Sequence, residues 1–405
     1  MSEITLTTYH DVQRAFRRKS LKQALYDEGG VIMRDVLLTL HGDAHRSRRR
    51  LENRLFRRET FHLYDSELIP RLIAEEVEPA AANGRADCLG IGHRATLHLT
   101  ALIAGVDRPA GTAAETERLY HFDLTFSEGA TLVHATGNRD AVRQRVATAL
   151  AAFDEEFLQP SIARRRSLLR EVRTGTIDEA SLSKDVLTVL LAHESDLADD
   201  PDTAAAIIRR EIAFFLQAGS HSSANAFTHA MDDLLTWFEE HPQDRRRCLD
   251  DPLFMQRCVH ESLRLHPASP VAWRVATEDM VLREGLAVAQ GTRVIMDLMA
   301  ANRDPDVFGP DAAEFNPHRP EPEGVPRWGH SFGGGMHVCI GMELDGGTTP
   351  DRGAADRAHH VIGVVPQLVG AMLAHGARRD PDHPPGWDDT SARPNFATYP
   401  IVFDQ

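Results

Sequence analysis

The sequence has few cysteines, and their arrangement speaks against one common use of cysteine. Only four occur among 405 residues, with no CxxC pair and no regular spacing: Cys88, Cys248, Cys258 and Cys339. Such a pattern is not typical of a disulfide framework. Free thiols fit a reducing compartment, so we expect a cytoplasmic protein.

Long apolar runs and an excess of positive charge are also missing. No stretch approaches the ~20 apolar residues that span a bilayer. Residues 1–10 lack the basic region and apolar core of a signal peptide, so we expect no association with a membrane. The net charge of −15 argues against general nucleic-acid binding, whose usual footprint is a basic domain.

The hydrophobic content nevertheless supports a large folded unit. Hydrophobic residues make up 42% of the chain, which is enough to bury a sizeable core. The length alone would allow two or more domains. However, the sequence shows no break in composition, no internal repeat and no low-complexity tract. We therefore expect residues 1–405 to form a single domain.

A glycine-rich loop around one cysteine is the most informative stretch. Three consecutive glycines, 333–335, precede Cys339, and Phe332 and His337 stand seven and two residues before it. Glycines let a backbone take positive φ angles and pass close to a flat object. The apolar run 340–344 predicts a helix just after the cysteine, whose N-terminus would stabilise a thiolate, a strong donor to iron. A buried structural cysteine is the alternative.

This loop resembles the haem-ligand signature of the cytochrome P450 family, Phe-Gly-x-Gly-x-His-x-Cys-x-Gly, at every fixed position from Phe332 to Gly341. The resemblance implies that Cys339 ligates the iron of haem b, that His337 reaches a haem propionate and that Phe332 shields the sulfur. It also implies a mainly α fold, a triangular helical prism with small β-sheets and a long central helix over the haem.

The most basic run of this acidic chain spans residues 45–58. His45 and Arg49 are four residues apart, so on a helix they share a face and could reach one anionic group. In the family such a pair contacts a haem propionate. The remaining arginines would form a positive surface for an acidic electron donor. A merely solvated helix face is the alternative for Arg46, Arg54, Arg57 and Arg58.

Residues 201–240 are the longest helical candidate, and Pro201 is well placed at its start. At its centre, Ala218 and Gly219 remove side-chain bulk, and a glycine inside a helix is unfavourable unless something large approaches. In the family the haem fills that space, and an acid and a threonine then manage protons for bound oxygen. This chain has His221 and Ser222 at those catalytic positions, and we expect His221 to titrate near neutral pH.

Further blocks match the family after the long helix. Glu261 and Arg264 form its Glu-x-x-Arg motif, with Arg319 as the third member. Buried opposite charges must pair, so we expect a structural network that holds the cysteine loop. Arg274 matches the arginine that binds a propionate in the family. Four positions are expected to contact substrate: Ser269, Val271, Ala272 and Phe396.

Two regions depart from the family pattern. A predicted helix over residues 9–16 begins so early that the strands usually found before it look shortened or absent, which puts the small β-rich part of the fold in doubt. After Leu344, Gly-Gly and Thr-Thr-Pro predict an insertion near residues 345–357. We expect the helix to resume near Ala354 and to run to about His375, with a kink at Pro366.

The resemblance implies a haem-thiolate monooxygenase that inserts one atom of O₂ into a small or medium-sized hydrophobic substrate. The reaction would be a hydroxylation or the O-demethylation of an aromatic methyl ether. Electrons would come from NAD(P)H through a ferredoxin or flavodoxin and its reductase. One alternative is a peroxide-driven peroxygenase, suggested by the missing acid–threonine pair. A non-catalytic haem-binding sensor is the other.

Overall fold

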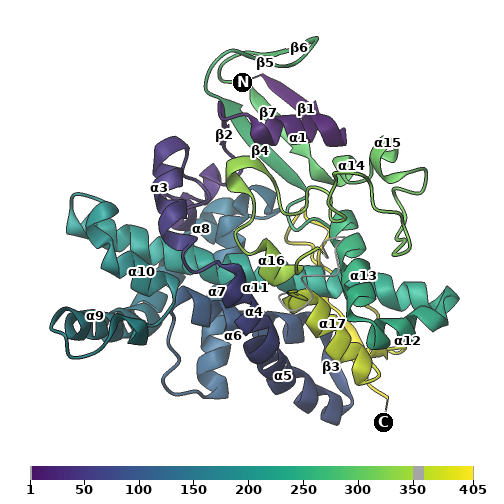
Figure 1. The fold of residues 1–405 in the computed structure, drawn as a ribbon, viewed down its shortest axis with the longest axis horizontal. Helices are drawn as coiled ribbons and strands as arrows, with labels where there is room; N and C mark the ends of the chain where they lie inside the picture. Colours follow the sequence, from purple (N-terminus) through teal and green to yellow (C-terminus); the bar gives the residue numbers. More distant parts are fainter. Residues whose placement is uncertain (1, 350–359, 405) are drawn as a thin grey trace.

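Helices dominate the computed structural model, which describes residues 2–349 and 360–404 (Figure 1). The helices are α1 (Tyr9–Arg17), α2 (Gly30–Met33), α3 (Gly42–Glu52), α4 (Arg58–Leu63), α5 (Ile69–Asn83), α6 (Cys88–Ala104), α7 (Ala113–Ala130), α8 (Arg139–Phe153), α9 (Gln159–Arg173), α10 (Val186–Ala192), α11 (Pro201–Glu240), α12 (Pro242–Asp250), α13 (Pro252–Leu265), α14 (Leu298–Ala301), α15 (Pro305–Phe308), α16 (Met342–Asp345) and α17 (Val364–Ala374). Within the described residues, no helix is long and apolar enough to cross a membrane.

Helix α11 crosses the centre of the molecule and contacts α6, α7 and α13 (Figure 1). Its 40 residues confirm the range that the sequence predicts. The start is fixed by Asp200, whose carboxylate accepts hydrogen bonds from the backbone N–H groups of Asp202 and Thr203 at 3.1 and 3.0 Å. These bonds satisfy donors that have no partner inside the first helical turn.

Helices α6 and α11 pack closely because small residues lie where they meet. A Cβ added to Gly92 would lie 2.7 Å from Cδ1 of Phe227, and one added to Gly219 would lie 2.2 Å from Cγ2 of Thr100. Well-packed interiors tolerate no such overlap. Both glycines are therefore required by the spacing of this helix pair.

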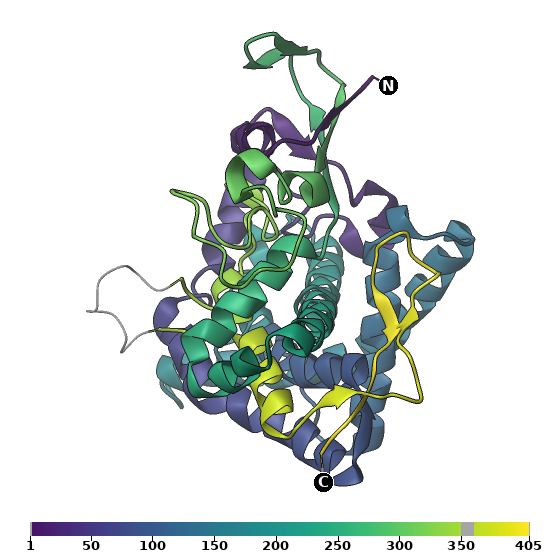
Figure 2. The ribbon, with the colours of Figure 1, turned by 90° about the vertical axis from the view of Figure 1, so that its right-hand side faces the viewer.

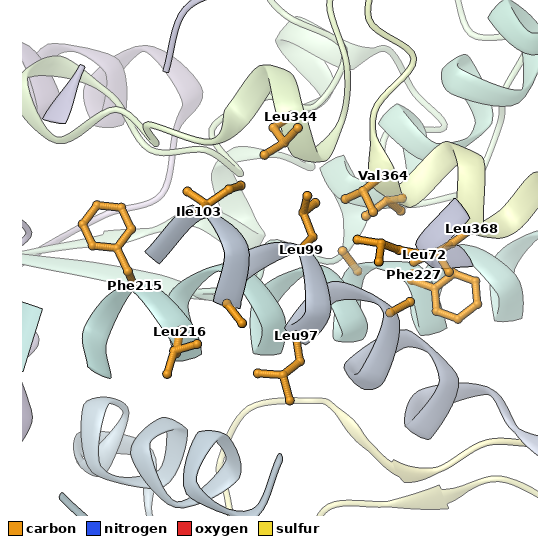
Figure 3. Close-up of a cluster of buried hydrophobic side chains, with 14 of the residues drawn as sticks. Leu72, Leu97, Leu99, Ile103, Phe215, Leu216, Phe227, Leu344, Val364 and Leu368 are labelled. Atoms are coloured by element: carbon orange, nitrogen blue, oxygen red, sulfur yellow. The ribbon is translucent and has the colours of Figure 1, made fainter. Parts of the chain in front are cut away.

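One hydrophobic core joins segments that are far apart in the sequence. Figure 3 shows Leu99 and Ile103 of α6 facing Leu344 of α16, while Phe215 of α11 and Leu368 of α17 lie on either side. Each of these residues is at most 8% exposed. The segment that follows the cysteine loop is therefore anchored to the same core as the central helix.

A four-stranded sheet combines the beginning of the chain with its last third, in the order β1-β7-β4-β2. Strand β1 runs parallel to β7, with Glu3 opposite Arg293, and β4 pairs antiparallel with both β7 and β2. The strands are β1 (Glu3–Leu6), β2 (Leu21–Gln23), β3 (Arg85–Asp87), β4 (Val271–Ala276), β5 (Met280–Arg283), β6 (Leu286–Val288), β7 (Arg293–Asp297), β8 (Arg378–Arg379), β9 (Gly386–Trp387), β10 (Phe396–Thr398) and β11 (Pro400–Val402).

The sequence put this sheet in doubt because the strands before the first helix looked shortened or absent, but the sheet is present. Strand β1 is present before α1, and Leu6 at its end is buried in a second hydrophobic cluster with Val294 and Met296 of β7. The strand has only four residues, but pairing along its whole length and one buried side chain are sufficient to hold it. Figure 2 shows the first residues running beside the sheet at the top of the molecule.

The segment after Leu344 differs from the predicted helix. Helix α16 ends at Asp345, residues 360–363 are not helical, and α17 begins only at Val364. Much of the predicted insertion, including Ala354, lies outside the described residues. Pro366 does not kink a helix, because it stands in the first turn of α17, where its missing N–H has no partner to lose.

Candidate active site

A cavity of about 340 Å³ lies between the centre of α11 and the loop that carries Cys339. One wall comes from α11 and includes Ala218, Gly219, His221 and Ser222. The opposite wall comes from the cysteine loop. Residues from that loop and its surroundings complete the lining: Phe332, Gly333, His337, Val338, Cys339, Ile340, Gly341 and Leu344.

Close backbone contacts hold the cysteine loop in place. Gly333 and Gly335 have φ angles of 68° and 63°, and a Cβ on Gly335 would lie 1.9 Å from the carbonyl oxygen of Phe16. Glycine is needed at Gly335 for both reasons. The N–H of Cys339 donates to the carbonyl of Phe332 at 3.0 Å, which closes the loop on itself. The loop thus presents Cys339 to the cavity.

Cys339 lines the cavity, and its side chain is exposed, unlike those of the other three cysteines. Burial raises the pKa of this thiol to about 11, and the nearby carboxylate of Asp345 adds to the rise. The N–H of Gly341 and the guanidinium of Arg49 act in the opposite direction. Helix α16 begins three residues after Cys339 and has only four residues, so the N–H of Gly341 before it is the backbone group that favours the thiolate. A bound cation is what would keep this sulfur deprotonated.

Four basic side chains gather beside the loop, and none of them forms an ion pair with a carboxylate of the described residues. Nη1 of Arg49 donates to the carbonyl of Val338 at 3.0 Å, and Nη1 of Arg274 donates to Oε1 of Gln23 at 2.5 Å. The rings of His45 and His337 lie 4.6 Å apart. Both ring nitrogens of His337 and Nε2 of His45 are buried and have no hydrogen-bond partner among the described residues.

These basic groups, which lack carboxylate partners among the described residues, fit a haem. Two arginines and two histidines, all lining the cavity that Cys339 faces, match a flat ligand with a metal at its centre and two carboxylates at one edge. Burial and the neighbouring cations lower the pKa of His45 to about 4 and that of His337 to about 3. Neutral imidazoles can still donate one N–H each to an anion.

Ala218 and Gly219 both line the cavity. A Cβ on Gly219 would overlap Thr100 of α6, which also lines the cavity. The packing of α6 against α11 is therefore one reason for a glycine here, and room for a haem stays a prediction. The backbone of Gly219 forms the cavity wall, and its small size serves the packing of α6.

The structure contradicts the expectation that His221 titrates near neutral pH. Burial lowers its pKa well below the usual value, and the charge of Arg393 and the ring of His93 lower it further. Nη2 of Arg393 lies 2.8 Å from Nε2 of His221. Because arginine can only donate, Nε2 must accept, and the proton of the neutral ring is on Nδ1.

The hydroxyl of Ser222 lies on the cavity wall and donates to the carbonyl of Ala218 at 2.5 Å. Its proton is therefore directed into its own helix, while its oxygen can accept a further hydrogen bond. The neighbouring hydroxyl of Ser223 donates to Asp345, and burial raises the pKa of that carboxyl to about 6. Asp345 is a cavity residue that no sequence pattern indicated.

Two of the four expected substrate contacts line the cavity. Ser269 and Ala272 do so, whereas Val271 and Phe396 do not. Side chains alternate along a strand, so Ala272 and Arg274 of β4 face the cavity together and Val271 points away. Phe396 packs into the core, with its ring stacked 4.3 Å from that of Trp387.

Arg393 stands three residues before Phe396 and lines the cavity instead. It is the main functional candidate that the sequence reasoning missed. Nothing in the local sequence distinguishes Arg393 from a surface arginine, since Ala392 and Pro394 beside it are exposed. Its position follows from the path of the whole C-terminal segment, whose backbone also bonds to residues 134 and 136.

The predicted charge network is assembled behind the cysteine loop. Nη2 of Arg264 lies 2.6 Å from Oε1 of Glu261, and Nε of Arg319 lies 3.1 Å from the same oxygen. All three side chains are buried. Arg264 also donates to the carbonyls of Asn302 and Ala312, both at 2.6 Å, so the network joins α13 to the segment that leads into the loop.

The basic run of residues 45–58 is not one helix. Helix α3 ends at Glu52 and α4 begins at Arg58. Arg48 is buried and forms an ion pair with Glu211 of α11, so it does not belong to the surface. Arg46, Arg54 and Arg57 are exposed.

Comparisons with known proteins point to one family. The family model described as Cytochrome P450 matches residues 231–344. The chain is 32% identical to the bifunctional cytochrome P450/NADPH--P450 reductase 2 of Bacillus subtilis over 201 residues, which are 45% of this chain and 18% of that protein. It is 28% identical to cytochrome P450 4F4 of Rattus norvegicus over 275 residues, 61% of this chain and 48% of that protein. The match thus spans less than half the length of each relative.

The solved structures agree over almost the whole chain. CYP154A1 from Streptomyces coelicolor A3(2) has a TM-score of 0.73 at 18% identity, covering 99% of this chain and 91% of that one. P450BioI has a TM-score of 0.72 at 17% identity, with 99% and 92% covered. At such identities the likeness establishes the fold. The predicted mainly α architecture with small sheets is therefore confirmed.

Proposed function

We propose that the chain, which matches the Cytochrome P450 family model over residues 231–344, is a haem-thiolate monooxygenase. It would insert one atom of O₂ into a small or medium-sized hydrophobic substrate. The observation that carries the proposal is one cavity lined by Cys339 and by basic groups without carboxylate partners, Arg49, Arg274 and His337.

In this proposal the haem supplies the reductive activation of O₂, and side chains of this chain bind and surround it. Cys339 holds the iron through its sulfur. Arg49 and Arg274 bind the propionates, with His45 and His337 as further donors. Phe332 covers the sulfur side, where it packs edge-on against Trp328 with ring centroids 5.5 Å apart.

Apolar side chains and one hydroxyl set the conditions in the rest of the cavity. Leu99, Ile103 and Leu344 exclude water from its walls (Figure 3). The oxygen of Ser222 can hold one water molecule, because its own proton is bonded to Ala218. His221 stays neutral and contributes no proton of its own at neutral pH.

Electrons would reach the site from NAD(P)H through a ferredoxin or flavodoxin and its reductase. The chemistry on the substrate would be a hydroxylation, or O-demethylation where the oxidised carbon is the methyl group of an aryl ether. A peroxide-driven reaction would use the same cavity without these electron donors. Supplying either NADH with the donor proteins or hydrogen peroxide alone separates the two routes.

The proposed function is tested by the spectrum of the reduced carbon-monoxide complex. The wild-type protein should show the strongly red-shifted Soret band of thiolate ligation. Cys339→His should lose that band, while Cys258→Ser, a buried cysteine outside the cavity lining, should keep it. If Cys339→His retains the band, Cys339 is not the ligand. If the wild-type protein never shows it, the proposed function is wrong.

A further inference from the structure

Arg393 reaches into the substrate side of the cavity from the segment before β10. Its Nη2 lies 2.8 Å from Nε2 of His221 and 3.3 Å from Oγ1 of Thr131, and its Nη1 lies 3.5 Å from the carbonyl of Ala268. Nε is buried and has no hydrogen-bond partner among the described residues. All the partners of Arg393 are uncharged.

Among the described residues, four of the five arginines with buried side chains meet a carboxylate, and the exception is Arg274 beside the cysteine loop. The pairs are Arg48 with Glu211, Arg165 with Asp185, Arg264 with Glu261 and Arg319 with Glu261. No carboxylate oxygen of the described residues lies within 4.0 Å of a guanidinium nitrogen of Arg393, the limit for an ion pair. The side chain of Asp388 acts on its charge only from a distance and accepts hydrogen bonds from the backbone and hydroxyl of Thr390.

The groups around Arg393 do not neutralise it. A guanidinium stays charged in proteins, even where burial lowers its pKa. Burial raises the pKa of the Tyr26 phenol, so this nearby group is uncharged. Burial and Arg393 itself lower the pKa of His134 to about 4, and His221 is neutral as well. The positive charge of Arg393 therefore remains uncompensated on this side of the cavity, apart from the charges of Arg49 and Arg274 beside the cysteine loop.

A buried charge without a partner is unfavourable, and an anion that enters the cavity would relieve it. One guanidinium offers several N–H donors to one carboxylate, and the neutral ring of His221 has a buried Nδ1–H with no partner. A single positive charge suits a monoanion. The cavity also has apolar walls from Leu25, Leu38 and Phe214, which suit a hydrocarbon body.

We propose that Arg393, supported by His221, binds the carboxylate of the substrate, and that the substrate class is a hydrophobic monocarboxylic acid. This inference rests on the proposed function. The residues proposed for the haem propionates are different ones. Arg49, Arg274 and His337 border the cysteine loop, and none of the hydrogen bonds of Arg393 goes to them. Arg393 is bonded instead to α11 and to the segment after α7.

Binding to the haem-loaded protein tests the inference without relying on turnover. Two acids, octanoate and 4-methoxybenzoate, are titrated against their methyl esters, which have nearly the same shape and no charge. Spin-state spectra and calorimetry both report the affinity. The acids should bind about ten- to a hundredfold more tightly than the esters, as expected for hydrogen bonds to a charged group.

Variants assign this preference to Arg393. Arg393→Met should remove the advantage of the acids and leave ester binding nearly unchanged, whereas Arg393→Lys should retain part of it. Arg118→Met, which alters an exposed arginine paired with Glu156, is the control and should bind like the wild type. If Arg393→Met misfolds, Arg393→Lys against wild type still reports the contribution of the guanidinium.

Other results overturn the inference. Esters that bind as tightly as acids, or acids that fail to bind at millimolar concentration, would show that the cavity does not select a carboxylate. Loss of haem from Arg393→Met and Arg393→Lys would place Arg393 in the cofactor site. In all these cases the wild-type protein would still show the thiolate Soret band. Its absence would instead refute the proposed function.

Discussion

Gly219 and Thr100 meet where α11 crosses α6, and a Cβ on Gly219 would lie 2.2 Å from the methyl carbon Cγ2 of Thr100. A glycine within a helix costs about 1 kcal/mol relative to alanine. The close packing of the two helices offsets that cost. The contact lies in the cavity wall, since both residues also line the cavity.

Gly219→Ala should destabilise the protein by about 1–3 kcal/mol, because overpacking outweighs the gain in helix propensity. Thr100→Ser removes only the methyl group that would clash and keeps the hydroxyl, which donates to the carbonyl of Leu97. The double variant should therefore be more stable than Gly219→Ala alone. Denaturant unfolding of all four proteins measures this coupling. Additive effects would contradict the contact.

The buried carboxyl of Asp123 should make the free energy of unfolding depend on pH. The carboxyl is fully buried, and burial raises its pKa to about 7, although a hydrogen bond from Ser220 at 2.6 Å opposes the shift. A carboxyl with a raised pKa in the folded state holds its proton there and loses it when unfolded. Its contribution to stability therefore falls as pH rises from about 4 to about 7 and stays low above that range.

Asp123→Asn removes this titration. The free energy of unfolding of the variant relative to wild type should rise by roughly 2–4 kcal/mol between pH 4 and pH 8. Any constant effect of the amide cancels in this difference. Asp199→Asn, at an exposed position, should show no such change. A flat difference for Asp123→Asn would mean that the carboxyl is ionised in the folded protein at pH 5.

The exposed arginines after α3 predict how an electron donor docks. Arg54→Glu and Arg57→Glu should slow reduction of the haem by an acidic ferredoxin or flavodoxin, since charge complementarity accelerates encounter. Added salt should slow the wild type in the same way, because exposed charges are screened. Stopped-flow reduction rates measure both effects. Arg173→Glu on α9 is the control, and equal rates for all variants across salt concentrations would leave residues 54–57 as ordinary surface.

Local signals in the sequence predicted the first helix, α1, and the long central helix, α11. Helix α11 was found over its full length because an N-terminal proline and a long apolar pattern stand in one segment. Strand β1 was not found, because its partner β7 is about 290 residues away in the sequence and no local pattern reports such a pairing. Val271 was wrongly predicted to contact substrate. The alternation of side chains along β4 could have excluded it as a cavity residue, once it was known that Arg274 faces the cavity.

The site was predictable where it is a short motif and not where it depends on long-range contacts. The loop around Cys339 was found because Phe332, the glycines and His337 stand at fixed spacings before the cysteine. His221 was placed on the right helix, but its protonation depends on Arg393, 172 residues later. Phe396 was predicted to contact substrate from its place in the C-terminal strand region, whereas the structure presents Arg393 to the cavity and buries Phe396 in the core.

The pairing of β1 with β7 has a consequence for the newly made chain. Residues 3–6 leave the ribosome well before the strand that they join, Arg293–Asp297, which is made about 290 residues later. At 5–20 residues per second, β1 waits roughly 15–60 s for its partner. During that time it is an unpaired edge that can pair with other nascent chains. Synthesis of many chains at once on one messenger should therefore lower the yield of native protein. A chaperone that binds residues 3–6 should restore the yield.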